Sequence, residues 1–290
     1  MHQITYTYIN LPHLYLLPEK LISPIKVIKD THNKIVMTKD DLLVVEGVRK
    51  TFGGLVALDE VNMKVKKNLL VMLIGPNGSG KTTLINVISG IYKPDKGKII
   101  FENKEITECS ADEVCREGLV RTFQIPQLFT KLTVLENVLT AYKDNPGTSF
   151  LKACVKRTWI QRETEATKKA FEILDTVGLS HMWDKRASEL SGGQMKLLET
   201  ARALMSGAKM IMMDEPAAGV FPSLIDKIFK HFVELKKKFG LTFLIIEHRL
   251  EPVLPYVDYV YAMDRGRVIS EGKPKEVLND EKVIESYLGE

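Results

Sequence analysis

The sequence has few cysteines and no long apolar run, and each shortage excludes a class of protein. Three cysteines occur in 290 residues, Cys109, Cys115 and Cys154, and they show neither a metal-ligand spacing nor an even set for disulfides. We therefore interpret them as ordinary small side chains in a reducing cytosol. The longest apolar runs, such as residues 69–74, have the length of a strand, far short of the roughly 18–20 residues of a membrane span. We expect any work at a membrane to go through a partner.

A large excess of charge of one sign is also absent from the sequence. The net charge is only +4, and the two signs are mixed along most of the chain, so the sequence carries no basic footprint for nucleic acid. Hydrophobic residues make up 44% and charged residues 27%, which is typical of globular proteins, and the length is ample for a buried core.

The first forty residues differ in composition from the rest. They mix aromatic residues with prolines and lack the basic start and apolar core of a signal peptide. We predict that residues 1–40 form an N-terminal extension, either disordered or an artefact of start-site assignment with Met37 as the true initiator. Residues 41–290 are predicted to form the folded domain.

From residue 42 onwards, strand-like and helix-like segments alternate. Residues 42–68 indicate short strands, and residues 69–75 indicate a buried strand that leads directly into a glycine-rich loop. Two further apolar runs, ending at Asp214 and His248, have strand length and flank a helix-like segment. This alternation predicts an α/β fold with a largely parallel sheet, which binds ligands at the carboxyl ends of its strands.

Two other segments depart from the alternation. Residues 128–190 lose the strand signal and carry helical spacing, which predicts a mostly helical subdomain inserted into the α/β core. Residues 257–272 indicate a hairpin that turns at Asp264, Arg265 and Gly266.

The glycine-rich loop reads GPNGSGKTT and matches the pattern Gly-x4-Gly-Lys-Thr. Its glycines permit a tight turn and leave backbone N–H groups free to bind phosphate oxygens. Lys81 adds a positive charge for the β- and γ-phosphates of ATP, and the Thr82 hydroxyl suits Mg²⁺. The predicted nucleotide-binding residues are Gly75, Pro76, Asn77, Gly78, Ser79, Gly80, Lys81, Thr82 and Thr83.

A pair of carboxylates ends one of the apolar runs. Asp214 and Glu215 would be costly there unless a cation or proton transfer offsets the cost, although a solvated pair at a strand end is the simpler alternative. Beside a phosphate loop, Asp214 suits the Mg²⁺ shell and Glu215 suits polarising the attacking water. His248 ends the other run, where a sensor of the γ-phosphate would lie.

A second glycine-rich helix start lies in ELSGGQMKLLET. Ser191, Gly192 and Gly193 occupy the predicted first turn, where unpaired N–H groups and a partial positive charge favour an anion. The segment has no lysine at its start, so we infer that it does not hold a nucleotide alone.

Together, these features resemble the ATP-binding subunits of ABC transporters over residues 42–290. The run Ser191, Gly192, Gly193 and Gln194 resembles the ABC signature, which separates this family from other phosphate-loop ATPases. The resemblance implies a P-loop NTPase (RecA-like) core with an antiparallel β subdomain and an inserted helical signature subdomain at about residues 128–200 of an ABC ATPase domain.

The resemblance also implies roles for single residues. Glu215 would be the catalytic base, Gln124 the Q-loop glutamine and a Mg²⁺ ligand, and His248 the switch histidine. Lys81 would act in catalysis as well as in binding. Phe52 would stack on adenine, which needs only an aromatic face.

In the family, two ATPase subunits pair head to tail, and the signature of one covers the γ-phosphate bound by the other. The implied cofactors are ATP and Mg²⁺. The implied partners are a second copy or a related ATPase subunit, two multi-span permease subunits and an external solute-binding protein, with the ATPase at the cytoplasmic face of the cell membrane.

Softer motifs resemble the branched-chain (hydrophobic) amino acid importer branch: RTFQIPQLFTKLTVLENVL, DEPAAGV and VIESYLGE. Urea or amide importers and the lipopolysaccharide-type export ATPase use similar motifs and stay open as alternatives. A non-transport ABC ATPase acting on DNA or ribosomes is disfavoured, because the chain has no long coiled coil and no second cassette.

Two departures from the family pattern stand out. Val220 and Phe221 precede Pro222 in the D-loop, where the family usually has Leu and then a polar residue. Arg249 follows His248, where the family commonly has an acidic residue.

Overall fold

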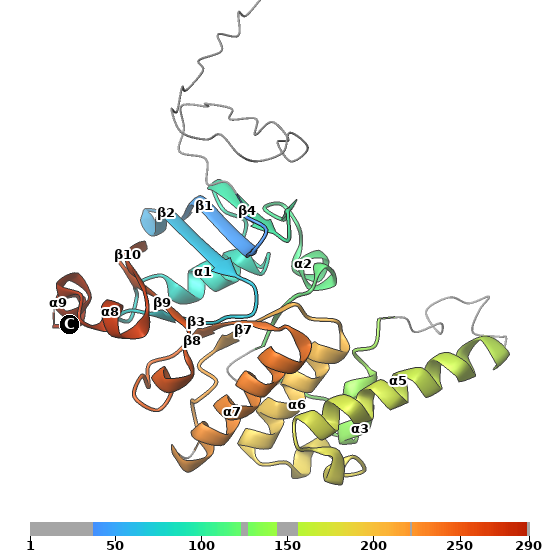
Figure 1. Ribbon diagram of the computed structural model, residues 1–290. Helices are drawn as coiled ribbons and strands as arrows, with labels where there is room; N and C mark the ends of the chain where they lie inside the picture. The colour runs from blue at the N-terminus through green and yellow to red at the C-terminus, as the bar shows by residue number, and fades with distance from the viewer. Residues whose placement is uncertain (1–36, 123–126, 144–155, 221, 289–290) are drawn as a thin grey trace, which may run out of the picture. The chain divides into compact units, whose positions relative to one another are not determined.

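The computed structural model describes residues 37–122, 127–143, 156–220 and 222–288. They form two β-sheets with helices packed between and below them (Figure 1). The strands are β1 (Asp41–Phe52), β2 (Leu55–Lys66), β3 (Leu70–Ile74), β4 (Lys96–Phe101), β5 (Lys104–Glu105), β6 (Leu119–Arg121), β7 (Met210–Asp214), β8 (Thr242–Ile246), β9 (Tyr259–Asp264) and β10 (Arg267–Gly272).

The described helices lie between groups of strands along the chain and after the last strand. They are α1 (Lys81–Ile88), α2 (Ala111–Glu117), α3 (Val134–Leu139), α5 (Lys156–Thr176), α6 (Gly192–Met205), α7 (Pro222–Phe239), α8 (Pro274–Leu278) and α9 (Glu281–Leu288). Short 3-10 turns cover Ser180–Met182, Ala187–Glu189 and Leu254–Tyr256.

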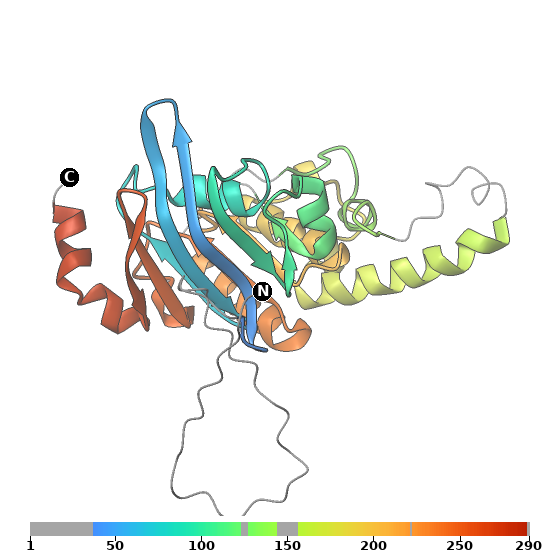
Figure 2. The same ribbon diagram turned by 90° about the horizontal axis from the view of Figure 1, so that it is seen from above.

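The smaller sheet is antiparallel, with strand order β2-β1-β4-β5. Its longest feature is the β1–β2 hairpin, which projects beyond the other strands in Figure 2. The larger sheet has the order β10-β9-β3-β8-β7-β6, and all its pairings are parallel except the β9–β10 hairpin.

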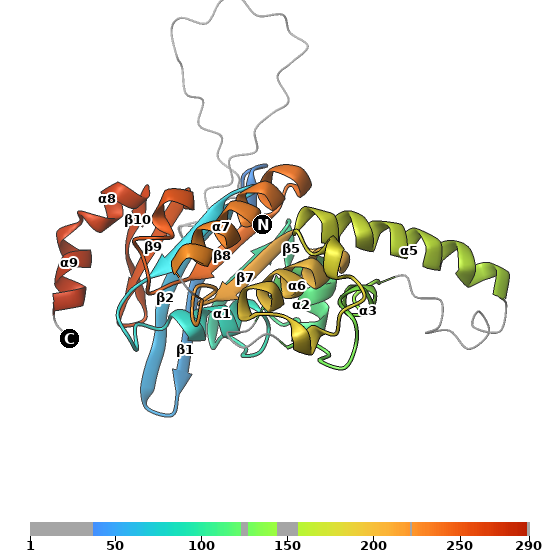
Figure 3. The ribbon, with the colours of Figure 1, turned by 90° about the horizontal axis from the view of Figure 1, so that it is seen from below.

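Strand β3 lies between two hydrophobic cores, and its side chains pack into both of them. Leu70, Met72 and Ile74 pack into the cluster formed with α3, α5, α6 and α7, the helices gathered on one side in Figure 3. Val71 and Leu73, of opposite parity, pack with α1 and the antiparallel sheet. Because side chains alternate along a strand, a fully apolar run of five residues fills both cores.

The expected strands and the β9–β10 hairpin are confirmed, as is the helix that follows the glycine loop. Four elements were not predicted from sequence: α2, β6, α8 and α9, each of eight residues or fewer. Among the described residues, no helix combines the length and apolarity needed to cross a membrane.

The parallel pairing places the candidate residues on one edge of the sheet. Leu73 of β3 and Asp214 of β7 both pair with Ile246 of β8. The loops that follow these three strands therefore begin side by side, at the carboxyl edge where ligands bind in such sheets.

Candidate active site

The phosphate loop joins β3 to α1, and Lys81 closes it. The buried Lys81 ammonium donates to the carbonyl oxygens of Gly75 and Pro76 at 2.8 and 2.7 Å, and it lies 3.3 Å from Ser79 Oγ. The cation thus lies inside the curve of the loop, where phosphate oxygens would compete for it as stronger, charged acceptors.

Two glycines of this loop are required by close backbone approach. A Cβ on Gly75 would lie 2.1 Å from the carbonyl oxygen of Met263, and one on Gly80 would lie 2.7 Å from that of Ala57. Both residues also have positive φ, at 146° and 101°, which disfavours any side chain.

Asp214 ends β7 and faces a partly buried arginine. Its Oδ2 lies 3.6 Å from Nη2 of Arg121 on β6, and Arg121 also donates to Asn86 on α1. Burial raises the pKa of the Asp214 carboxyl, and the charge of Arg121 opposes that rise. Arg121 therefore favours the ionised form of Asp214.

Glu215 and His248 come together across neighbouring strands. His248 Nε2 lies 3.3 Å from Glu215 Oε1, and both side chains are partly exposed. Glu215 has a left-handed backbone with φ of 51°, unusual for a residue with a side chain. The structure thus joins a carboxylate and an imidazole that are 33 residues apart in sequence.

The donor set at this edge fits Mg²⁺. Thr82 is exposed in the first turn of α1, and Asp214 is half-buried, so a hydroxyl and a carboxylate offer the hard oxygen ligands that Mg²⁺ prefers. No group of three or more His, Cys, Asp or Glu in the described ranges could hold a metal. A Mg²⁺ ion that is bound together with a nucleotide needs only a few protein ligands, because phosphates and waters complete its coordination shell. Gln124 lies outside the described residues.

Phe52 presents its ring at the end of β1, with 41% of its surface exposed. Tyr92 packs edge-on against it at 5.2 Å between centroids. Asp95 fixes the preceding residue, because its carboxylate accepts from the amide and hydroxyl of Thr51, both at 2.6 Å, and from Lys50 at 2.9 Å. These bonds lower the pKa of Asp95 to about 2.

The second helix start is α6, with Ser191 as its N-cap. Ser191 and Gln194 form a capping box: the Ser191 amide donates to Gln194 Oε1 at 2.9 Å, and the Gln194 amide donates to Ser191 Oγ at 3.4 Å. Gly192 is exposed, and a Cβ placed on it meets no atom within 4 Å. The described chain's packing therefore does not explain this glycine, whereas Gly75 and Gly80 are required by their surroundings.

The C-terminal helix α9 contacts the phosphate loop. The Gly75 amide donates to Tyr287 Oη of α9 at 2.8 Å. Loop residues and α9 residues line a shared cavity of about 500 Å³, together with Asp264 and Arg265 of the β9–β10 turn. A residue 212 positions away thus helps to fix the first residue of the loop.

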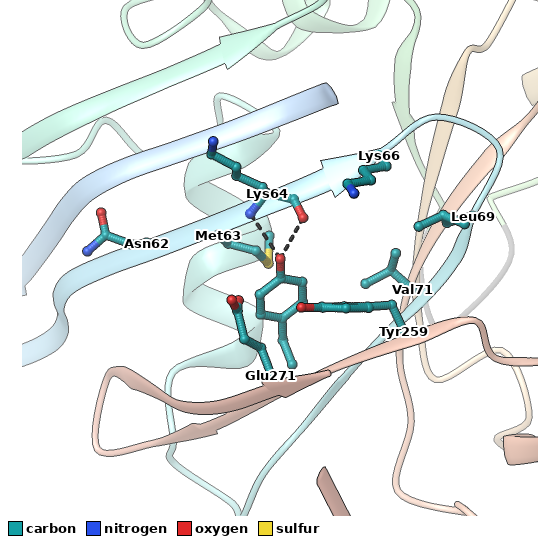
Figure 4. Close-up of a pocket in the computed structure, with 9 residues that line it drawn as sticks. Asn62, Met63, Lys64, Lys66, Leu69, Val71, Tyr259 and Glu271 are labelled. Carbon is teal, nitrogen blue, oxygen red and sulfur yellow. Dashed lines mark hydrogen bonds between the residues drawn. The ribbon is translucent and has the colours of Figure 1, made fainter. Parts of the chain in front are cut away.

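A second cavity, of about 570 Å³, lies elsewhere, between β2 and the β9–β10 hairpin (Figure 4). Its lining includes the apolar or aromatic residues Leu69, Val71 and Tyr259 and the charged residues Lys66 and Glu271. None of the predicted site residues lines it, so its size does not make it the candidate active site.

Sequence reasoning missed several residues that support the site. Arg121, Tyr92, Asp95, Lys196, Glu247 and Tyr287 each contact a predicted site residue or the segment that bears it. Their common signal is a polar or aromatic side chain close in space but distant in sequence, which no local motif encodes.

Known proteins share this fold and these motifs. A family model described as "ABC transporter" matches residues 58–218, and one described as "Branched-chain amino acid ATP-binding cassette transporter" matches residues 267–290. A "Probable branched-chain amino acid transport ATP-binding protein LivG" from Methanocaldococcus jannaschii is 52% identical over 254 residues, covering 86% of this chain and 98% of that protein.

Two solved structures extend the likeness. One, the ADP conformation of an ATP-binding cassette of an ABC transporter, is 50% identical with a TM-score of 0.74, covering 86% of this chain and 99% of that chain. The other, a dimeric bacterial ABC transporter cassette, is 27% identical with a TM-score of 0.63, covering 80% of this chain and 98% of that chain. With the phosphate loop, the carboxylate edge and the capped second helix start in place, the chain belongs to the ABC transporter family as a nucleotide-binding ATPase cassette.

Proposed function

We propose that this chain is the ATP-hydrolysing subunit of an importer for branched-chain amino acids or chemically similar amino acids. The hydrolytic part of the proposal is carried by the 3.3 Å contact of Glu215 and His248 beside the phosphate loop. The solute is inferred from the relative that is 52% identical and from the C-terminal family match.

The residues divide the reaction between them. Lys81 exchanges its loop carbonyls for the β- and γ-phosphates of ATP, and Phe52 stacks on the adenine ring. Glu215 accepts a hydrogen bond from the attacking water and polarises it. His248 lies close enough to Glu215 to orient its carboxylate. In this proposal His248 also contacts the γ-phosphate of bound ATP.

Thr82 and Asp214, with Gln124, would hold Mg²⁺, and Arg121 would keep the Asp214 carboxylate ionised and turned toward that position. Bound there, Mg²⁺ supplies positive charge that neutralises the phosphate oxygens during transfer.

The exposed start of α6 belongs in this proposal to the nucleotide of a second subunit. Gly192 and Gly193 begin the helix and offer N–H groups, and the approach to Gly192 is open, but the helix start has no lysine. A head-to-tail pair, with a second copy or a related subunit, would place this start over the partner's γ-phosphate. ATP then stabilises the dimer, and hydrolysis releases it. The remaining partners are two multi-span permeases and an external binding protein, with this chain at the cytoplasmic face of the membrane.

Replacing Glu215 tests the hydrolytic assignment. Glu215→Gln should bind a fluorescent ATP analogue within about twofold of wild type, lose at least about 100-fold of its turnover and accumulate an ATP-dependent dimer in size-exclusion chromatography. Normal turnover by this variant would contradict the role of Glu215.

The solute assignment needs the whole transporter. A pull-down of the tagged protein from its native membranes in mild detergent, with ATP present, should recover permeases and a binding protein. That binding protein should bind leucine, isoleucine or valine in calorimetry. Recovery of ribosomes, DNA or lipid-export components would overturn the importer while leaving the ATPase chemistry intact.

A further inference from the structure

The turn that follows β7, residues 215–220, holds its first residue in a strained conformation. Glu215 has φ of 51°, in the left-handed region that the Cβ of an L-residue disfavours. Such a conformation persists only where the surrounding structure imposes it. The Glu215 amide is held from one side, because it donates to the carbonyl oxygen of Ile246 at 2.9 Å.

Lys196 holds the same turn from α6. Its ammonium donates to the carbonyl oxygens of Pro216 and Ala218 at 2.6 and 2.7 Å, and it lies 3.3 Å from that of Glu215. An ammonium has three donors, so these three carbonyls use its full capacity. Lys196 lies five positions after Ser191 and is part of the helix that begins there.

Two residues that flank His248, just after β8, also hold the turn. Glu247, 2% exposed, accepts from the Ala217 amide, and Arg249 Nη1 donates to the Val220 carbonyl oxygen at 3.2 Å. The cations bind carbonyls and the anion binds an amide, so each charge matches its backbone partner. The contact of Arg249 with Val220 also joins two positions where the sequence departs from the family pattern.

The position of the strain indicates what these contacts do. The left-handed residue is the one whose carboxylate lies 3.3 Å from His248. A relaxed backbone at Glu215 would redirect its side chain and break that contact. The bonds of Lys196 to Pro216 and Ala218 would be enough to stabilise the turn alone. Its third contact, with the carbonyl oxygen of Glu215, acts on the residue that bears the carboxylate.

We propose that Lys196 is a positioning residue for Glu215, and that Glu247 and Arg249 support it. The Lys196 ammonium makes the start of α6 and the turn of Glu215 move as one unit. An anion bound at Ser191 would then change the position of the Glu215 carboxylate in the same chain. This inference rests on the proposed role of Glu215 in hydrolysis.

The test uses the full chain with Lys196→Met, which keeps the apolar stem and removes the donors. We expect kcat to fall at least about tenfold, since a positioned general base contributes about 10²–10⁴-fold. The KM for ATP and the affinity for a fluorescent ATP analogue should stay within twofold of wild type. Lys196→Arg, which restores donors, should recover at least threefold of the lost kcat. Lys143→Met is the matched control, because Lys143 also donates to a carbonyl, that of Arg116, but at an exposed position away from the site.

Arg249→Met carries the same test if the Lys196 variant does not fold, because Arg249 is exposed and its loss should lower kcat about threefold without changing KM. Wild-type kcat in both variants would overturn the proposal. So would a rise in KM equal to the fall in kcat, because that result means general loss of structure. Glu215→Gln distinguishes failure of the proposed function from failure of this inference. Normal turnover by Glu215→Gln would refute the role of Glu215 as base. An inactive Glu215→Gln together with a fully active Lys196→Met would refute only the positioning role of Lys196.

Discussion

The molecule contains two glycine-rich helix starts, and they are built differently. The start of α1 is closed: Gly80 is its left-handed N-cap, and the Lys81 ammonium lies inside the loop. The start of α6 is open and capped by its own Ser191–Gln194 box. Each helix has a lysine bound to backbone carbonyls, but Lys196 turns inward to the Glu215 turn.

The difference indicates separate tasks. The first start carries its own cation and can hold a nucleotide within one chain. The second start has N–H groups and open space, but the nearby cation, Lys196, is bonded to the turn that follows Glu215. We expect this start to receive a phosphate that another subunit holds, and the bonds of Lys196 would then link that phosphate to the turn of Glu215.

The largest effect should come from the cation of the first start. Lys81→Met removes the buried charge and its bonds to Gly75 and Pro76. Affinity for a fluorescent ATP analogue should fall about 10- to 100-fold, as expected for the loss of a charge-assisted bond to phosphate. Affinity within twofold of wild type would show that this loop does not hold the phosphates.

Next come matched glycine substitutions, of which only the one at Gly80 should lower stability. Gly80→Ala places a Cβ 2.7 Å from the Ala57 carbonyl oxygen at φ of 101°, and it should destabilise the fold by about 1–3 kcal/mol. Gly192→Ala meets no atom within 4 Å, and it should leave stability unchanged or raise it by up to about 1 kcal/mol. Urea unfolding of both variants measures the contrast, and equal destabilisation would remove it.

Gly192→Ala should nevertheless impair hydrolysis. Its methyl group enters the space proposed for the partner's γ-phosphate, so turnover should fall about tenfold while the chain's own nucleotide affinity is unchanged. Steady-state turnover and analogue titration on one preparation separate the two quantities. Full activity would mean that nothing approaches this helix start during the cycle.

The smallest effect concerns the support of Phe52. The folded pKa of Asp95 is lowered to about 2 from 3.8, so its contribution to stability is complete above about pH 4 and is lost as the pH falls toward 2. The unfolding midpoint of Asp95→Asn should therefore lie below that of wild type at pH 7, and the gap should close between pH 4 and 2. A gap that stays constant to pH 2 would contradict the assigned bonds.

Local patterns made one part of this molecule predictable. The apolar run of β3, the GPNGSGKT loop and α1 are contiguous, so strand, turn and helix could be predicted together. Apolar runs ending at Asp214 and His248 predicted two strands, and the parallel pairing of β7 with β8, which ends at Ile246, placed Glu215 and His248 on one edge.

The missing parts depend on contacts between distant residues. Strand β6 has only three residues and no periodicity to detect, yet it supplies Arg121 to Asp214. The bond from Gly75 to Tyr287 spans 212 positions, and that from Lys196 to Ala218 ends on a backbone carbonyl, which any residue provides. Sequence pattern cannot specify partners of that kind. Gln124 and Phe221 lie outside the described residues, so their predicted roles stay predictions.

The most direct test of the shared site is complementation between two defective variants. Lys81→Met lacks a working phosphate loop, and Gly192→Ala lacks a working second start. In a head-to-tail dimer of the two chains, one site combines the intact loop with the intact start. We predict that mixing equal amounts with ATP raises turnover clearly above the mean of the separate variants, on a scale set by the wild-type protein. Turnover equal to that mean at every mixing ratio would show that each chain's site is complete by itself, and it would contradict the account.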